Sequence, residues 1–378
     1  MKKIIIAVDS FKGTLSSARA AEIIENAVND LNPGIDIRRV ALADGGEGSI
    51  EALGAKRVYQ TVSNPFFEPM ESCYGIMGKT AVIEIAACAG LPLAGDRKNP
   101  ELTTSCGAGE LMSAALDNGC RRFILALGGS CTNDAGCGMS AALGVKFYTS
   151  DGGEFIPTGK TLSQIADIDI SGLDVRVRDC DITAMCDIKN PLFGENGAAY
   201  IYAPQKGADR EMVLRLDAGL RRFSEAVKDK LNIDVADVPG AGAAGGIGAG
   251  ALAFLGGKLR RGIDIALDTA GFNNLLEGAD LVITGEGRFD LQSLDGKAVS
   301  GVAARCAKAG VPCVALCGSV GEDIQNEKYP SLFEKHGITA VFSIQTEPLE
   351  YNEAVKNTER NLYYMAGNIA RLFVVRGK

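Results

Sequence analysis

The sequence predicts an α/β protein built from parallel strands and the helices that connect them. Short apolar runs, typical of buried strands, alternate with segments whose apolar residues recur at helical spacing. Residues 3–42 read as strand, helix and strand in succession, and such a βαβ unit implies a parallel sheet with a right-handed crossover. At about 150 residues per domain, the 378 residues are enough for about two domains.

The individual elements follow from these periodicities. The run KIIIAV at residues 3–8 predicts a buried strand, and residues 16–31 predict a helix with Ser16 or Ser17 as its N-cap. We expect further strands at residues 35–42, within 71–89 (strand, turn, strand), and at 122–127, 182–187, 198–202, 281–284, 311–318 and 338–343. We expect further helices at residues 105–118, 139–143, 210–231, 247–255, 299–309 and 353–373.

The two ends of the chain resemble each other in pattern more than either end resembles the middle. We therefore expect one parallel-sheet α/β domain made of residues 1–70 and 272–378, and a second α/β domain with a mixed sheet, residues 71–271, inserted into it. Because ligands commonly bind between domains, we expect the ligand site in a cleft between the two.

The composition excludes several classes of function. A net charge of −8 and a pI of about 5.0 argue against nucleic acid or an anionic membrane surface as a partner, since both need a basic surface. The apolar run near the N-terminus is too short for a signal peptide, and residues 239–257 are too rich in glycine to insert well into a membrane. Eleven cysteines without a CxxC pair, beside the single His336, argue against structural zinc and indicate core thiols of a reducing compartment, so we expect a cytoplasmic protein.

Two nucleotide-binding patterns can be checked directly. The P-loop pattern GxxxxGK[ST] is absent, and the pattern GxGxxG occurs at residues 240–245. The segment before it is a poor strand that ends in proline, whereas a dinucleotide site needs a strand leading directly into the turn. We therefore favour a glycine-rich turn at a helix start, in which Gly242, Gly245 and Gly246 let backbone N–H groups receive a phosphate.

Polar loops follow several of the predicted strands, at the positions where parallel sheets bind ligands. After the first strand, Lys12 in DSFKGT would neutralise a phosphate or a carboxylate, with Asp9 holding it in place. After the second strand, ADGGEG places Asp44 and Glu47 among three glycines, and carboxylates in such a loop suit Mg²⁺. The alternatives are a βα turn with a solvated lysine and an Asp-Gly turn that leads into a helix.

The segment LALGGSCTNDAGCGM combines a strand end, a glycine pair and a run of polar residues. Gly128 and Gly129 free the backbone. Ser130 and Thr132 offer hydroxyl groups, and Asn133 with the aspartate after it would cap the next helix. This is one way to build a helix N-terminus that accepts phosphate, and an ordinary capped βα junction is the alternative.

Three further segments complete the set of candidate site residues. Asp187 in CDIKNPL follows a predicted strand, where it would be the base that orients a substrate hydroxyl. Lys206 in PQKGA ends the next predicted strand and adds a cation. In TGEGRFD, Glu286 and Asp290 flank Arg288. Each segment is also explained by a turn or loop with solvated charges.

Together these loops offer carboxylates, cations and hydroxyl groups. Phosphoryl transfer needs a divalent metal, cations on the phosphates and a carboxylate near the attacking hydroxyl, and it needs no covalent nucleophile. The set therefore favours phosphoryl transfer. An NAD-linked oxidoreductase of small hydroxy acids and a non-catalytic sensor of sugar acids stay open as alternatives.

The same motifs also resemble a known family. From residue 3 to about residue 318, the sequence is similar to the bacterial glycerate kinases that form 2-phosphoglycerate, in the ordered motifs DSFKGTLSS, ADGGEGS, LGGSCTNDAGCGM, CDIKNPLFGENGAA, PQKGA, GAGAAGGIGAG and LVITGEGRFDLQSLDGK. Cys131 is a departure, because relatives often carry a small residue such as alanine there. The resemblance implies ATP- and Mg²⁺-dependent phosphorylation of D-glycerate, and two α/β domains of which one is Rossmann-like and discontinuous.

The roles of single residues are our interpretation beside that resemblance. We expect Asp187 to orient the substrate hydroxyl, with Lys12 and Lys206 as further catalytic candidates. The other candidates are substrate contacts (Asp44, Glu47, Arg288 and Asp290), metal ligands (Glu286 and Asp44) and phosphate contacts (Gly128, Gly129, Ser130, Thr132, Asn133, Gly242, Gly245 and Gly246). The sequence leaves open which glycerate oxygen is phosphorylated, which small hydroxy acid is preferred and whether the chain forms a homo-oligomer.

Overall fold

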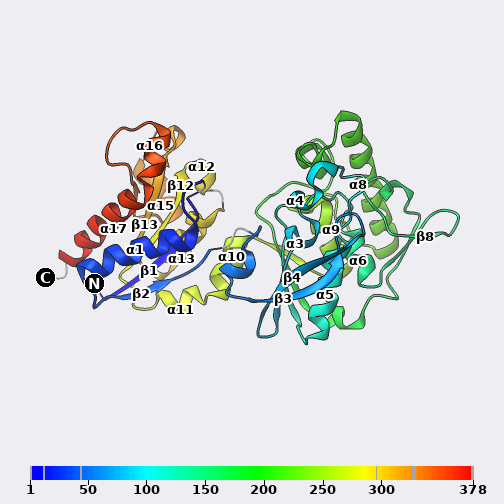
Figure 1. Ribbon diagram of the computed structural model, residues 1–378, viewed down its shortest axis with the longest axis horizontal. Helices are drawn as coiled ribbons and strands as arrows, with labels where there is room; N and C mark the ends of the chain where they lie inside the picture. The colour runs from blue at the N-terminus through cyan, green and yellow to red at the C-terminus, as the bar shows by residue number, and fades with distance from the viewer. Residues whose placement is uncertain (1, 12, 43–44, 295, 326–328, 376–378) are drawn as a thin grey trace. The chain divides into compact units, whose positions relative to one another are not determined.

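The structure is a computed structural model that describes residues 2–11, 13–42, 45–294, 296–325 and 329–375. By the packing of its backbone the chain divides into two compact units (Figure 1), one formed by residues 1–44 and 263–378 and the other by residues 45–262. The α/β fold class expected from the sequence, with a parallel sheet and a mixed sheet, is confirmed.

The first unit contains a fully parallel sheet with the strand order β14-β13-β12-β1-β2. Its strands are β1 (Lys3–Val8), β2 (Asp36–Arg39), β12 (Leu281–Phe289), β13 (Cys313–Val320) and β14 (Ala340–Ser343). From β1 the chain passes to β2 on one side and later returns to β12 on the other side. The strand order therefore reverses direction at β1, which is where open α/β sheets bind ligands.

Helices cover both faces of this sheet. They are α1 (Ser17–Leu31), α10 (Gly262–Thr269), α11 (Phe272–Leu276), α12 (Leu291–Leu294), α13 (Ala298–Ala309), α14 (Glu322–Gln325), α15 (Tyr329–His336), α16 (Tyr351–Lys356) and α17 (Thr358–Val375). Ile4 and Ile6 of β1 pack against α1 and α17, whereas Ile5 and Ala7 belong to the core that contains α13. Alternate residues of β1 thus supply both cores, as the pleat of a strand requires.

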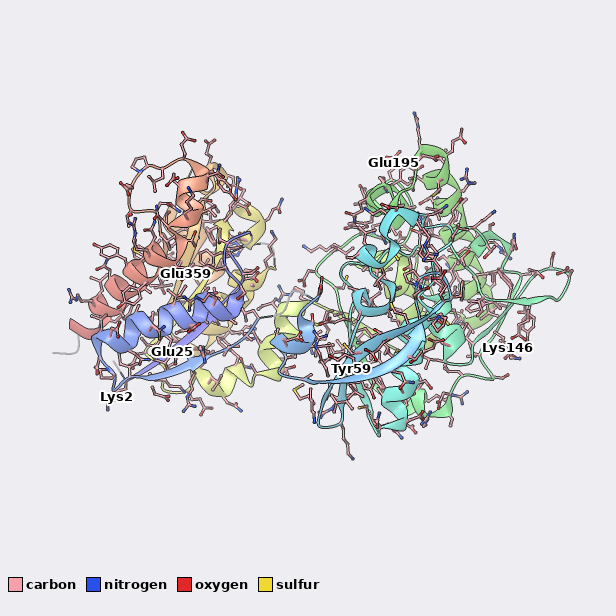
Figure 2. All side chains as sticks on the ribbon, viewed as in Figure 1. Lys2, Glu25, Tyr59, Lys146, Glu195 and Glu359 are labelled. Carbon is pink, nitrogen blue, oxygen red and sulfur yellow. The ribbon has the colours of Figure 1, made fainter. Side chains whose placement is uncertain are left out.

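The pairing of α1 with α17 joins the two ends of the chain. These helices, blue and red in Figure 1, lie side by side. The Ser16 hydroxyl accepts the backbone N–H of Arg19, which confirms the predicted N-cap of α1. The Arg19 guanidinium also pairs with Glu359 of α17 (labelled in Figure 2) at 2.7 Å, and because both side chains are about half exposed, this ion pair adds little stability.

Two predicted elements of the first unit have different bounds. The strand expected at residues 281–284 continues to Phe289, because glycines let the neighbouring backbones approach closely: a Cβ at Gly285 would lie 2.0 Å from the Leu316 carbonyl oxygen. The glycines of this motif therefore serve strand packing where a loop was expected. The helix expected at residues 353–373 is divided into α16 and α17, which are separated by Asn357.

The second unit contains a mixed sheet with the order β11-β10-β6-β5-β4-β3 and a small antiparallel sheet with the order β8-β7-β9. The strands are β3 (Lys56–Ser63), β4 (Pro69–Met77), β5 (Thr80–Glu84), β6 (Arg122–Ala126), β7 (Lys146–Tyr148), β8 (Glu154–Phe155), β9 (Asp167–Asp169), β10 (Asp181–Met185) and β11 (Lys258–Arg260). Strands β5, β6, β10 and β11 run parallel, so their carboxyl ends meet at one edge of the sheet.

The domain borders expected at residues 70/71 and 271/272 stay a prediction. The compact units described here change at residues 44/45 and 262/263. The difference arises because β3 pairs with β4, so this strand belongs to the mixed sheet and not beside β1 and β2. Strand periodicity alone does not show which sheet a strand joins.

Helices of the second unit pack around the mixed sheet. They are α2 (Ser49–Ala52), α3 (Ala86–Ala89), α4 (Leu91–Ala94), α5 (Cys106–Asp117), α6 (Cys137–Ala142), α7 (Ala198–Tyr202), α8 (Arg210–Leu231), α9 (Ala243–Leu255) and the short 3₁₀ helix η4 (Pro204–Lys206). The predicted helix at residues 210–231 is confirmed. The strand predicted at residues 198–202 is wrong, since this segment forms α7, in which the two alanines favour the helix and which packs against α8.

Three further observations concern the cysteines, the apolar character of the helices and the single histidine. All eleven cysteines are free thiols, and nine of them are buried. Among the described residues, no helix has both the length and the apolar character needed to cross a membrane. His336 is the last residue of α15.

Candidate active site

A cavity of about 820 Å³ lies at the carboxyl edge of the parallel sheet in the first unit. Strand β12 runs past the end of β1, because its last pairing with β1 joins Val8 to Gly285 while its own course continues to Phe289. The backbone N–H of Asp9 then donates to the Gly285 carbonyl at 2.8 Å, which holds the loop after β1 beside the extended strand. The cavity thus lies where the strand order reverses.

Three residues predicted from the sequence line this cavity together, namely Glu286, Arg288 and Asp290. Asp290 caps α12, since its carboxylate accepts the Ser293 N–H at 3.2 Å and its own N–H donates to the Ser293 hydroxyl at 3.0 Å. Arg288 is mostly exposed and lies 3.6 Å from the Asp290 carboxylate, so it is available for an anionic ligand.

Glu286 is the most unusual carboxylate of the cavity. Its Oε1 atom is buried, and no hydrogen-bond donor of the described residues reaches it. Burial, reinforced by the nearby charge of Asp9, raises the pKa of Glu286 to about 7. A buried carboxylate oxygen without a partner is costly for the protein alone, so the position is suited to a cation or a donor group brought by a ligand.

The part of the cavity formed by β13 and by the segment after β14 was not predicted from the sequence. Ser319 lies near the carboxyl end of β13, and Gln345 and Glu347 lie shortly after β14. The rule that was applied to the other strands, polar residues beyond a carboxyl end, would have identified Gln345 and Glu347. They were overlooked because no glycine-rich motif marks this segment.

In the second unit, two predicted segments lie on neighbouring strands. β6 and β10 are parallel and in register at Ala126 and Met185, so Gly128 and Asp187 both follow the sheet at the same edge. Asp187 is exposed, and its Oδ1 accepts the Gly262 N–H at 2.8 Å. The loop at residues 45–46 reaches Gly128, whose N–H donates to the Gly45 carbonyl at 2.8 Å.

Lys206 is buried within the second unit, with 3% of its surface exposed. It is the last residue of η4 and not the end of a strand. Its Nζ donates to the Ser130 hydroxyl at 3.0 Å and to the Thr132 carbonyl at 2.7 Å, so three predicted site residues are joined directly. Burial lowers the pKa of Lys206 to about 8. The cation therefore fixes the loop that follows β6.

The expected phosphate cradle is only partly open. Gly129 is exposed and Gly128 is half-buried, whereas Thr132 and Asn133 have no exposed surface. The Asn133 amide also lacks hydrogen-bond partners among the described residues. The fully buried Asp134 does not simply cap the next helix but accepts N–H groups of Ser105, Gly136 and Gly138, which ties the starts of α5 and α6 together.

The glycines of the second expected cradle have a packing role. A Cβ at Gly242 would lie 2.3 Å from the Pro191 carbonyl oxygen, and one at Gly245 would lie 2.0 Å from the Thr132 carbonyl oxygen. A Cβ at Gly246 would lie 2.8 Å from the Cα atom of Ala135. The described residues 232–239 contain no strand, so the arrangement of a dinucleotide fingerprint is not formed there.

Three predicted residues remain, namely Lys12, Asp44 and Glu47. Lys12 and Asp44 lie outside the described residues. Glu47 is exposed in the turn before α2. Within the described ranges, no group of three or more His, Cys, Asp and Glu side chains is arranged to hold a metal ion. Glu286 and Asp290 nevertheless fit Mg²⁺, which is commonly bound by one or two carboxylates together with water and phosphate oxygens.

Fold and site together define an α/β protein with a polar ligand cavity at a sheet edge. The sequence model that describes the glycerate kinase family matches residues 4–374 of this chain. The chain is 43% identical to a glycerate kinase of Bacillus subtilis (97% of each chain) and 42% identical to the glycerate 2-kinase of Escherichia coli (99% of this chain and 98% of that protein). A crystal structure titled as a glycerate kinase 2 of Salmonella typhimurium superposes with a TM-score of 0.86 at 39% identity, covering 100% of this chain and 99% of that one.

The chain therefore belongs to the glycerate kinase family. The family resemblance inferred from the ordered motifs is confirmed, and with it the expected enzyme class, a phosphotransferase. The family membership leaves the individual site residues as predictions.

The depressed pKa of Lys206 leads to a testable pH dependence. Between its folded pKa of about 8 and the ordinary value of 10.5, the unfolded chain binds a proton that the folded chain has lost, so stability rises with pH in this window. We expect the free energy of unfolding of the wild type, minus that of Lys206→Met, to increase by about 3 kcal/mol from pH 8 to 10.5. Denaturant titrations at several pH values measure this, and a constant difference would contradict the assigned burial.

Proposed function

We propose that the chain transfers the γ-phosphoryl group of ATP to the 2-hydroxyl of D-glycerate and releases ADP and 2-phosphoglycerate. The P–O bond to ADP breaks, a P–O bond to the glycerate oxygen forms, and the hydroxyl proton passes to a base. The name of the Escherichia coli relative supports the 2-position. The family membership supports the phosphoryl transfer itself.

One observation of this structure supports the proposal most strongly, namely the buried Glu286 oxygen in a cavity that also holds Arg288 and Asp290. Phosphoryl transfer depends on positioning and on charge neutralisation, and it therefore requires carboxylates for a metal beside cations for phosphate. The cavity offers both kinds of group within one hollow at the sheet edge.

We assign Mg²⁺ to Glu286 and Asp290. The ion, when bound, neutralises charge that develops on the transferred phosphoryl group. The protein's own contribution is a carboxylate with one buried oxygen, Glu286 Oε1, that no donor of the described residues reaches, and a second carboxylate held in place by Ser293. Arg288 then serves the phosphates or the substrate carboxylate.

In the second unit, Asp187 is the proposed base that orients the attacking hydroxyl. It is exposed at the carboxyl edge of the sheet, and the Gly262 N–H fixes one of its oxygens. Gly128 and Gly129 are the part of the loop after β6 that a phosphate can reach, since they retain exposed surface. Lys206 acts through Ser130 and is a positioning residue, because its own amine is buried.

We further propose that the protein works in the cytoplasm with D-glycerate and ATP as its partners. The eleven free thiols support a reducing compartment, where cysteines persist without pairing. The acidic charge of the chain gives no basis for a nucleic-acid partner.

The direct test of the proposed function is a coupled assay in which the purified chain receives ATP, Mg²⁺ and D-glycerate. We expect ADP formation that depends on glycerate, and phosphorus NMR of the product should show 2-phosphoglycerate. Formation of 3-phosphoglycerate would contradict the assigned position. ADP formation that is independent of glycerate would contradict the assigned acceptor.

The role of Asp187 is tested by Asp187→Asn. The amide oxygen still accepts the Gly262 N–H, so the fold should persist, while loss of the base should lower kcat about a hundredfold or more. The control is Asp181→Asn, an exposed position at the opposite end of β10, for which we expect normal turnover. Near-normal turnover of Asp187→Asn would remove this residue from the mechanism.

A further inference from the structure

The cavity of the first unit is much larger than D-glycerate, the phosphoryl acceptor of the proposed function, requires. Its volume of about 820 Å³ lies in the range of pockets that enclose drug-sized organic ligands. A three-carbon hydroxy acid would leave most of this space empty. The size therefore points to a larger ligand that occupies the hollow beyond the carboxylates of β12.

The charge of the cavity also argues against a small organic anion. Among the described lining residues, carboxylates outnumber cations, the carboxylates being Asp9, Glu286, Asp290 and Glu347 and the cations Arg288 and Lys297. A free carboxylate would meet net repulsion here. A neutral group that donates hydrogen bonds would meet attraction.

A second buried acceptor lies on the side of the cavity that follows β14. The Oε1 atom of Gln345 is buried and has no donor among the described residues. The orientation of the amide is fixed, because its Nε2 atom donates to the Gly318 carbonyl at 3.3 Å. Since Glu286 is assigned to the metal, Gln345 Oε1 is a buried acceptor that a hydroxyl or amino group of an organic ligand would satisfy.

The same side of the cavity carries apolar and aromatic surface. Leu349 and Tyr351 line it although they are 37% and 74% exposed, and Val355 of α16 lies beside them. Exposed apolar side chains that gather at one cavity mark a binding surface, whereas single ones need no explanation. A flat ring that packs on Tyr351 would cover part of this surface.

We propose that this cavity binds the nucleoside of the phosphoryl donor. The base packs against Leu349, Tyr351 and Val355, and a ribose hydroxyl or the exocyclic amine donates to Gln345 Oε1. The proposal rests on the proposed function for the identity of the donor, and it adds the site that recognises it. The phosphates then extend toward the carboxylates and Arg288 at the end of β12.

The position in the fold is independent support for a nucleoside. In open α/β sheets the crevice at the reversal of strand order takes ligands at the carboxyl ends of the strands. The residues that line the cavity lie at or after the ends of β1, which is the strand at the reversal, and of the strands β12, β13 and β14 on one side of it.

The experiment is a calorimetric titration of adenosine, and of ADP in the presence of Mg²⁺, into the wild type and Ala354→Trp. Ala354 lines the cavity from α16, so the indole would occupy the space assigned to the base. We expect both ligands to bind the wild type and to bind Ala354→Trp about tenfold or more weakly. The control Leu372→Trp adds the same side chain at an exposed position of α17 outside the cavity and should bind as the wild type does.

A second variant protects the test against misfolding. Tyr351→Ala removes a side chain that is 74% exposed, so the fold should persist, and we expect the affinity for adenosine to fall roughly tenfold through lost packing on the base. Unchanged ADP affinity in both folded variants would overturn the proposal. The proposal would also be overturned if these two variants had an elevated KM for glycerate and an unchanged KM for ATP, because the cavity would then hold the phosphoryl acceptor.

These outcomes separate the proposal from the function on which it rests. If the wild type transfers phosphate to glycerate and Ala354→Trp retains the wild-type KM for ATP, the nucleoside site is wrong and the kinase assignment stands. If the wild type binds adenosine and Ala354→Trp does not, while no transfer to glycerate occurs, the nucleoside site is supported and the assigned acceptor is wrong.

Discussion

The parallel pairing of β1 with β12 is the constraint on which the candidate site depends. It places a strand from the N-terminus beside one that begins at Leu281, and it reverses the strand order at β1. Because β12 continues to Phe289 while β1 ends at Val8, the sheet has an uneven carboxyl edge. The cavity lies beside the part of β12 that extends beyond β1. Sheet topology therefore brings together its carboxylates, its cations and its apolar side.

Two glycines of the predicted motifs allow backbone segments to approach more closely than a residue with a Cβ atom would permit. Gly285 in the first unit and Gly245 in the second each lie where a Cβ would collide with a carbonyl oxygen. These contacts build a long strand in one case and hold the loop before α6 in the other. The buried Lys206 and Asp134 complete the second arrangement, because Lys206 donates to the Thr132 carbonyl and the Ser130 hydroxyl, and Asp134 accepts the N–H groups of Gly136 and Gly138. A rigid loop of this kind leaves only its glycine pair exposed to a ligand.

Much of the fold could be predicted from the sequence, since β1, α1, α8 and α13 follow directly from apolar spacing and capping. The extension of β12 could not, because TGEGRFD has the composition of a loop and becomes a strand only through its pairing with β13. The candidate site could be predicted only in part, again because contacts between segments distant in sequence create much of it. Glu286 stood out between glycines, whereas Gln345 follows a strand without a glycine-rich motif and Tyr351 carries no local signal. The burial of Lys206 depends on contacts distant in sequence.

We have proposed that the carboxyl edge around β1 and β12 binds the phosphoryl donor. A crystal structure of the chain with a non-hydrolysable ATP analogue and D-glycerate would locate that donor. We expect density for the nucleoside in the cavity of the first unit, with its base on Tyr351 and a donor atom within hydrogen-bond distance of Gln345 Oε1. A nucleoside ordered on the second unit, with the cavity of the first unit holding solvent, would contradict it.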